Sequence, residues 1–236
     1  MEIISEPEWE ILFKSLAKCK GISVIIGKTD SGKSTLVHYL IDRFILGNMK
    51  VCLVDSDVGQ SSLGLPGTIS MKLFIPENGL EDFAFEKMSF IGTLNPARDV
   101  ASIIKQTKRM SNLCTAKSDS VLVDTSGLIS GEAGRTLKTA KIRALKPEHV
   151  IAIQRREELE AILELLEGPG IHKIRASAAA RTIPVRAASG SFVLPIGGAE
   201  RAERRFQWVK SSRPRCPCRW TVTGSCAGSA RPASVN

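Results

Sequence analysis

The sequence lacks any long apolar run, since none of its hydrophobic segments approaches the roughly 18 consecutive residues that a membrane-spanning helix needs. It also lacks a basic leader, because the chain opens on the acidic sequence MEIISEPEWE. Secretory signals and transit peptides both carry positive charge in this region. We therefore expect a cytoplasmic protein that has no membrane partner.

Acidic residues are almost missing from one end of the chain. Residues 176–236 contain ten of the 33 lysines and arginines but only two of the 24 acidic residues, so most of the formal charge of +9 lies there. The first 175 residues are nearly neutral. The basic character of the whole chain therefore does not indicate a nucleic-acid groove in its first 175 residues.

Cysteine is sparse, and the six cysteines show no spacing that is typical of a zinc site. Three of them lie in the basic segment, where no histidine follows the first two. The other three lie in or beside apolar segments, where a reduced thiol packs as a small apolar side chain. We expect these three to be reduced packing residues: Cys19, Cys52 and Cys114.

The most informative pattern is the loop in VIIGKTDSGKSTL, residues 24–36, which matches G-x-x-x-x-G-K-[ST]. Residues 22–26 are typical of a short buried strand and residues 34–46 of a helix, which is the context that this motif requires. Glycines let backbone N–H groups turn inward around phosphates, and the helix N-terminus adds the positive end of its dipole. Lys33 then reaches the terminal phosphates, and the Ser34 hydroxyl holds Mg²⁺. The loop predicts a nucleoside triphosphate site formed by Gly27, Lys28, Thr29, Asp30, Ser31, Gly32, Lys33, Ser34 and Thr35.

Two carboxylates follow the second apolar strand, in VDSDVGQSS. Asp55 and Asp57 come at its end, and Gln60 lies just beyond them. In a parallel sheet this end faces the phosphate loop, where a carboxylate holds Mg²⁺ or takes a proton from an attacking hydroxyl. An ordinary polar turn is the alternative. The two carboxylates and the glutamine favour the site, and we predict Asp55 and Asp57 as metal-region residues together with Ser34.

Polar side chains also follow two further predicted strands. Thr125 in VDTSG either contacts the phosphates or the acceptor together with the Gly127 backbone, or it caps a turn. Asn95 or Arg98 in GTLNPARD either faces the acceptor or belongs to a helix-capping turn. The residues alone leave both alternatives open.

Strands and helices alternate along the first 175 residues. Apolar runs predict strands, and stretches with helical periodicity predict helices between them. The further strands are at 50–57, 88–92, 120–127, 149–154 and 171–174, and the further helices at 97–113, 132–145 and 157–167. This alternation predicts an α/β P-loop NTPase fold with a mostly parallel sheet, helices on both faces, and ligands at the carboxyl ends of the strands.

Both periodicities are lost beyond about residue 176, where alanine, serine, glycine and proline dominate. We therefore divide the chain into a P-loop domain at 1–175 and an atypical basic C-terminal tail at 176–236. The tail is either disordered or a non-native C-terminus, for instance after a change of reading frame.

Four blocks of the sequence resemble, in order, the P-loop polynucleotide 5′-hydroxyl kinases. The blocks are DSGKST, VDSDVGQSSLGLPGTIS, FIGTLNPARD and VDTSGLISG. This family includes RNA-processing kinases of transfer-RNA and pre-ribosomal RNA maturation and stand-alone archaeal relatives. The resemblance implies transfer of the γ-phosphate of ATP, with Mg²⁺, to a 5′-hydroxyl of RNA or DNA. It also implies an RNA-processing complex as a partner.

The resemblance also implies roles for individual residues. Lys33 is assigned to the phosphates and Ser34 to Mg²⁺. Asp57 is assigned to the metal region and to activation of the acceptor hydroxyl, and Gln60 to support of the metal or its waters. Thr125 matches the element that clasps the phosphates and Lys33.

A lid with arginines follows the last core strand in this family. In the present chain IRASAAAR, residues 174–181, begins such a lid, with Arg175 or Arg181 as candidates, and we predict Arg181 as catalytic. The Arg/Glu-rich helix that the family carries next is absent from this sequence. Loss of lid arginines leaves nucleotide binding intact and weakens transition-state stabilisation.

Three other functions fit parts of the sequence. A ParA/MinD-like ATPase switch carries an extra loop lysine where Lys28 stands, although Thr29 and Asp30 replace the two glycines that follow it there. A GTPase is suggested by DVGQ and TAKSD, and guanine specificity would support it. A non-catalytic ATP-binding scaffold of an RNA-processing complex would bind ATP without consuming it.

Overall fold

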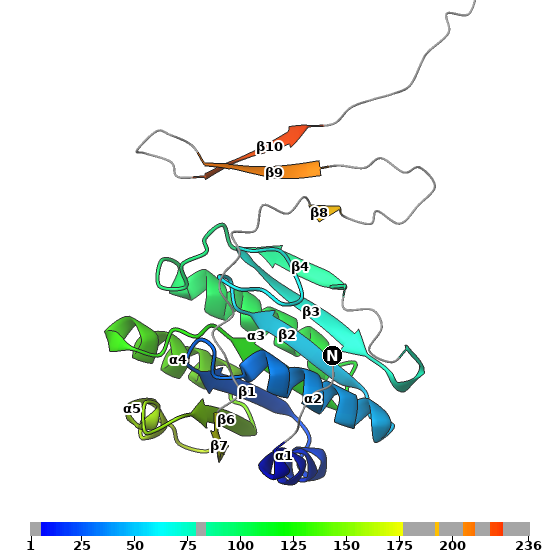
Figure 1. Ribbon diagram of the computed structural model, residues 1–236. Helices are drawn as coiled ribbons and strands as arrows, with labels where there is room; N and C mark the ends of the chain where they lie inside the picture. The colour runs from blue at the N-terminus through cyan, green and yellow to red at the C-terminus, as the bar shows by residue number, and fades with distance from the viewer. Residues whose placement is uncertain (1–5, 79–83, 177–191, 194–204, 211–217, 224–236) are drawn as a thin grey trace, which may run out of the picture. The chain divides into compact units, whose positions relative to one another are not determined.

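The computed structural model describes residues 6–78 and 84–176, together with the backbone of three short strands near the C-terminus (Figure 1). The chain divides into two compact units, Met1–Thr182 and Ile183–Asn236. The second unit contains an antiparallel sheet in the order β10-β9-β8, made of β8 (Phe192–Val193), β9 (Arg205–Lys210) and β10 (Cys218–Thr223). Most of the predicted basic tail lies outside the described residues, so its disordered or non-native character stays a prediction.

The first unit is built on a seven-stranded sheet in the order β4-β3-β2-β5-β1-β6-β7 (Figure 1). Its strands are β1 (Ile22–Gly27), β2 (Val51–Ser56), β3 (Thr68–Phe74), β4 (Lys87–Phe90), β5 (Ser120–Thr125), β6 (His149–Gln154) and β7 (Gly170–Arg175). The five strands from β2 to β7 in this order run parallel, whereas β3 pairs antiparallel with β2 and β4 antiparallel with β3. The prediction of a mostly parallel sheet is confirmed.

Helices cover both faces of this sheet because its central strands are apolar on both sides. The helices are α1 (Pro7–Lys18), α2 (Lys33–Leu46), α3 (Val100–Thr115), α4 (Gly131–Leu145) and α5 (Glu160–Leu163), with a 3₁₀ turn, η1, at Pro76–Asn78. In β1, Val24 and Ile26 pack in one core with α3 and α4, and Ile25 packs in the other core with α1 and α2. Helices on both faces are thus confirmed. Within the described ranges, no helix has the length and apolar character needed to cross a membrane.

Four elements differ from the sequence-based expectation. Helix α1 and strand β3 were not predicted, and the strand predicted at 88–92 lies at the sheet edge as β4, on an antiparallel excursion. The helix predicted at 157–167 is reduced to α5. At its two ends, the amides of Glu160 and Leu165 donate to carbonyls three residues back, so the backbone there forms 3₁₀-type turns instead of continuing as α-helix.

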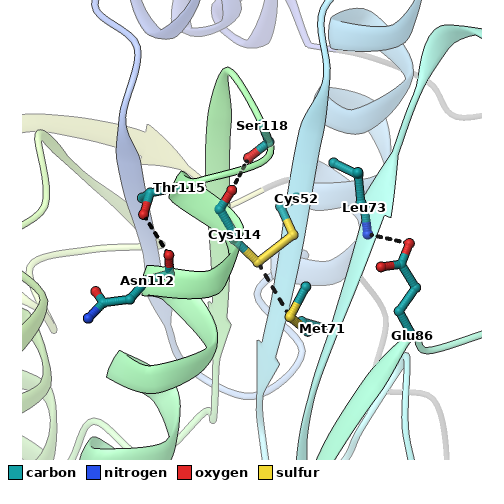
Figure 2. Close-up of a disulfide and its surroundings, with 8 residues drawn as sticks. All are labelled: Cys52, Met71, Leu73, Glu86, Asn112, Cys114, Thr115 and Ser118. Carbon is teal, nitrogen blue, oxygen red and sulfur yellow. Dashed lines mark hydrogen bonds between the residues drawn. A yellow bond between two sulfur atoms is a disulfide. The ribbon is translucent and has the colours of Figure 1, made fainter.

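A disulfide joins Cys52 of β2 to Cys114 of α3, across the contact of that helix with the sheet (Figure 2). Both side chains are fully buried, their Cα atoms are 5.6 Å apart, and Met71 Sδ lies 4.0 Å from Cys114 Sγ. The expectation of reduced thiols at these two positions is therefore wrong. The pairing depends on how α3 packs on β2, which a separation of 62 residues does not reveal. Cys19 is free but exposed, so the expectation that it packs against apolar side chains is wrong.

Candidate active site

The phosphate loop follows β1 and leads directly into α2. Asp30 and Gly32 have positive φ angles of 59° and 92°, and the Ser31 amide donates to the Lys28 carbonyl at 3.2 Å. A Cβ on Gly27 would lie 2.6 Å from Ser31 Oγ and 2.8 Å from the Ile153 carbonyl oxygen, so this position requires glycine. The loop therefore folds compactly over the N-terminus of α2, as the sequence predicts.

The predicted nucleotide contacts all lie on this loop or on the first turn of α2. Ser31 Oγ is buried and has no hydrogen-bond partner among the described residues. Gly27 and Lys33 are buried as well, while the remaining residues range from half-buried to exposed: Lys28, Thr29, Asp30, Gly32, Ser34 and Thr35. An unpartnered hydroxyl inside the loop fits a site whose hydrogen bonds are completed by a ligand.

Lys33 points its ammonium group back into the loop, where Nζ donates to the Lys28 carbonyl at 2.8 Å. Burial lowers the pKa of Lys33, and the carboxylates of Asp124, Asp57 and Asp30 oppose that shift. The lysine is thus held beside three acidic groups at the mouth of the loop.

Asp124, at the end of β5, contacts the first turn of α2. Its register partner in β1 is Ile25, and its Oδ2 accepts a hydrogen bond from Ser34 Oγ at 3.1 Å. Burial, and then repulsion from Asp55, raise the pKa of Asp124 to about 7, while Lys33 lowers it. The second oxygen, Oδ1, is buried and has no partner within the described part of the chain.

Those atoms fit a magnesium ion. Mg²⁺ prefers oxygen ligands and is held in proteins by one or two carboxylates together with waters and phosphates. The Ser34 hydroxyl and the unpartnered Asp124 Oδ1 supply such oxygens next to the phosphate loop. Sequence reasoning did not assign Asp124 to the site. The sequence pattern would have allowed this assignment, because Asp124, like Asp55, ends an apolar strand with a carboxylate.

Asp55 has a different environment, although it is the register partner of Asp124 in the next strand. Its Oδ1 accepts from the Asp57 amide at 3.0 Å. Its Oδ2 accepts from Ser61 Oγ at 2.8 Å, the Ser62 amide at 2.7 Å, Ser62 Oγ at 3.3 Å and the Leu63 amide at 3.0 Å. Burial raises the pKa of Asp55, and these hydrogen bonds oppose the shift. The carboxylate therefore shapes the loop that carries Asp57.

Asp57 begins that loop and is half-buried. Its Oδ1 accepts from the amides of Gly59 and Gln60 at 3.0 and 3.1 Å, which fixes the side chain at the start of the turn. The charge of Asp57 affects the pKa values of both Lys33 and Asp124, so the structure brings these three groups together. The Gln60 side chain is exposed at the same edge of the sheet.

Thr125 is fully buried. Its Oγ1 donates to the Ile25 carbonyl at 2.7 Å and accepts from Lys138 Nζ at 2.8 Å, so the hydroxyl joins β5 to β1 and to α4. The contact with the phosphate loop comes from the backbone of Gly127. A Cβ there would lie 2.5 Å from the Thr29 amide nitrogen and 2.7 Å from its Cα.

The turn at 93–99 has the character of a helix cap. Asn95 Oδ1 accepts from the Ala97 amide at 3.0 Å, and the Arg98 amide donates to the Asn95 carbonyl at 3.0 Å. Asp99 then caps α3 by accepting from the Ser102 amide at 3.0 Å. Of the two alternatives for this segment, these contacts favour the capping turn.

Three further cations near the site were not singled out from the sequence. Arg155, after β6, places Nη2 3.5 Å from the Asp30 carbonyl oxygen. Lys138 and Lys141 of α4 are buried behind the strand ends. The sequence did contain a pattern that could have identified the two lysines. They occupy positions on the buried face of α4 at which the helical periodicity predicts apolar residues. Arg181 lies outside the described residues.

The P-loop model of the mRNA cleavage and polyadenylation factor CLP1 matches residues 27–189. The chain belongs to this family. The chain is similar to two curated archaeal proteins named polyribonucleotide 5′-hydroxyl-kinase. It is 40% identical over 147 residues to the one from Methanocaldococcus jannaschii and 36% identical over 167 residues to the one from Pyrococcus furiosus. These alignments cover 61% and 67% of this chain but 40% and 45% of the relatives, so the chain spans less than half of their length.

A structure of the wild-type Clp1p–Pcf11p (454–563) complex shares the fold. It superposes with a TM-score of 0.57 at 15% sequence identity, over 73% of this chain and 48% of that one. The similarity supports the P-loop architecture that the strand order and the loop already define.

Proposed function

We propose that this chain is the P-loop domain of a polynucleotide 5′-hydroxyl kinase that transfers the γ-phosphate of ATP to the 5′-hydroxyl of RNA. The observation that carries the proposal is the gathering of Lys33, the Ser34–Asp124 pair and Asp57 at one edge of the sheet. The names of the archaeal relatives support the reaction, and membership of the family favours it over a ParA/MinD-like switch or a GTPase.

The binding of ATP rests on the phosphate loop and Lys33. Inward backbone amides and the N-terminus of α2 attract the phosphates, and the Lys33 ammonium neutralises their terminal charge. Ser34 and Asp124 are the residues that would hold Mg²⁺, which when bound neutralises the charge on the β- and γ-phosphates. Asp55 orders the loop that carries Asp57 instead of serving as a ligand, because its oxygens are occupied by hydrogen bonds.

The transfer step needs a base at the acceptor hydroxyl. The 5′-oxygen forms a bond to the γ-phosphorus, and the bond from that phosphorus to the β,γ-bridging oxygen breaks, so ADP leaves with the electron pair. The proton of the hydroxyl goes to the Asp57 carboxylate, which the Gly59 and Gln60 amides hold in place. The Gln60 side chain would bind waters of the metal ion. Thr125 stabilises the turn after β5, which packs on the phosphate loop, and Arg181 belongs to the lid.

The first experiment is transfer of labelled γ-phosphate from ATP to 5′-hydroxyl RNA and DNA oligonucleotides with Mg²⁺. We expect transfer to RNA that Lys33→Ala abolishes and that Lys105→Ala, at an exposed lysine of α3, leaves unchanged. Binding of ATP without transfer to either oligonucleotide would contradict the proposal and favour a scaffold. A preference for the DNA acceptor would change the substrate but not the reaction.

An RNA-processing complex and a cytoplasmic location also belong to this proposal. The complex is suggested by the name of the matching family model and by the partnership described for Clp1p with Pcf11p. Purification of the full chain from its own cell extract, with and without RNase, tests whether protein partners accompany it.

A further inference from the structure

Two lysines of α4 are buried where the helix packs against the sheet. Lys138 and Lys141 are 0% and 1% exposed, in a stripe that also contains Leu137, Ile142 and Leu145. Burial of an amine in such surroundings is costly unless hydrogen bonds compensate for the lost water. Since a methionine or leucine would fit the same stripe, the contacts that these lysines make are their distinguishing property.

Lys138 binds the turn that follows β5. Its Nζ donates to Thr125 Oγ1 at 2.8 Å, to the Ser126 carbonyl, and to Ser126 Oγ at 3.5 Å. Thr125 in turn donates to the Ile25 carbonyl in β1, and Gly127 packs on the backbone of Thr29 in the phosphate loop. Lys138 therefore holds the turn that supports the phosphate loop from one side.

Lys141 binds the end of β2 in the same way. Its Nζ donates to Ser56 Oγ and lies 3.5 Å from the Ser56 carbonyl oxygen. Ser56 Oγ also shares a hydrogen bond with Thr107 Oγ1 of α3 at 2.9 Å. Because Ser56 directly precedes Asp57, Lys141 fixes the point from which the proposed base projects.

The two lysines stand three residues apart on one helix, so they lie on the same face. The strand ends that they bind are also neighbours, with Ser56 and Thr125 as register partners. We propose that Lys138 and Lys141 are positioning residues that tie the turns after β5 and β2 to a single helix, and so fix Asp57 relative to the phosphate loop. The kinetic part of this inference depends on the proposed kinase function.

The charges around the pair are consistent with this arrangement. Burial lowers the pKa of Lys138 well below its usual range and that of Lys141 to about 8. The carboxylates of Asp57 and Asp124 oppose both shifts, and the charge of Lys141 adds to the lowering at Lys138. Positioning does not require a particular charge state, because an amine and an ammonium both carry N–H donors.

The test compares Lys138→Met and Lys141→Met with Arg135→Met, a matched variant at an exposed cation of the same helix. We expect each lysine variant to lower kcat by about 10- to 100-fold, the cost of a misplaced reacting group, with KM for ATP changed by less than about threefold. Arg135→Met should match wild type. Wild-type kcat in both lysine variants would overturn the inference.

A second measurement does not need kinase activity. Amide hydrogen exchange should become faster at residues 57–63 in Lys141→Met and at residues 126–129 in Lys138→Met, with the rest of the sheet unchanged. If wild type transfers no phosphate, the proposed function fails while the exchange data still test the positioning. Unchanged exchange at both turns would overturn the positioning even in an active enzyme.

Ser56→Ala tests the same route from the partner's side, and if Lys141→Met fails to fold it replaces that variant, with the same expected loss of about 10- to 100-fold in kcat. Ser56→Ala removes the hydroxyl that Lys141 binds and leaves the lysine in place. If Lys141 acts through Ser56, the loss in kcat for Ser56→Ala should resemble that for Lys141→Met, and the double variant should lose little more. Wild-type kcat in Ser56→Ala, or losses that multiply in the double variant, would contradict this route.

Discussion

Asp55 and Asp124 are the same residue type at paired positions of neighbouring strands, and yet the turns that they begin differ. Asp55 accepts hydrogen bonds from four residues of its own loop, so its carboxylate is used up in shaping that loop. Asp124 accepts one from Ser34 and keeps a buried oxygen without a partner in the described structure. The comparison shows that the number of nearby donors, and not the position at the strand end, decides whether a carboxylate oxygen is left without a partner in the described structure.

The largest effect should follow from Asp124→Asn. Loss of the carboxylate removes a predicted metal ligand, and we expect kcat/KM for ATP to fall by about 10²- to 10³-fold. The free energy of unfolding of this variant, by contrast, should increase at neutral and higher pH. The pKa of about 7 exceeds the ordinary value of 3.8, so the ionised group costs folding free energy as pH rises from about 4 to 7. The variant should therefore gain stability relative to wild type above pH 7 and match it below pH 4.

Kinetics and thermal unfolding at several pH values measure both changes. Wild-type activity in Asp124→Asn would contradict the assignment of Asp124 to the active site. A variant that is less stable than wild type at pH 8 would mean that the buried carboxylate is compensated by contacts beyond those described.

The pH dependence of Mg²⁺-dependent ATP binding should give the next largest effect. A carboxyl with a pKa of about 7 is about one-tenth ionised at pH 6 and mostly ionised at pH 8, so the affinity for Mg²⁺–ATP should rise about tenfold from pH 6 to pH 8. Titration of wild type with Mg²⁺–ATP at both values tests this. Asp124→Asn is the control, and its weaker binding should lack that pH dependence.

Asp55→Asn should have a smaller effect on activity but should lower stability. The amide group cannot accept from all the donors that face it, and we expect a loss of about 1–3 kcal/mol in the free energy of unfolding. The activity should fall by about tenfold because the loop carrying Asp57 loosens. Denaturant unfolding and kinetics together separate this result from that of Asp124→Asn. A stabilised and inactive Asp55→Asn variant would abolish the distinction between the two carboxylates.

Reduction of the Cys52–Cys114 disulfide should change activity least. The bond closes a loop of 62 residues, for which chain entropy predicts a contribution of about 4 kcal/mol to stability. Both sulfurs lie in the core and not at the site, so the native reduced protein should retain its kcat. Unfolding with and without reductant measures the effect, and a Cys52→Ala/Cys114→Ala variant should be insensitive to reductant.

The phosphate loop could be predicted from the sequence because glycine spacing and the flanking strand and helix are local features. Asp57 could be predicted for the same reason, since it directly follows an apolar strand. The environment of Asp124 could not be predicted, because its unpartnered oxygen depends on which strand lies next to β5. The lysines of α4 required knowledge of the buried helix face, and the disulfide required the packing of α3 on β2. Local patterns thus identified the residues that we propose as nucleotide contacts but not the contacts that hold them in place.

The paired lysines also have an evolutionary consequence. A buried amine at position 141 is tolerated because Ser56 accepts its hydrogen bond, and one at position 138 because Thr125 and Ser126 do so. Loss of the hydroxyl partner alone would deprive the buried amine of an acceptor, which costs free energy of folding. Across related sequences these positions should therefore change together, with the lysine and its hydroxyl partner lost in the same lineages. A helix grafted from a relative without these lysines would need its matching strand ends as well.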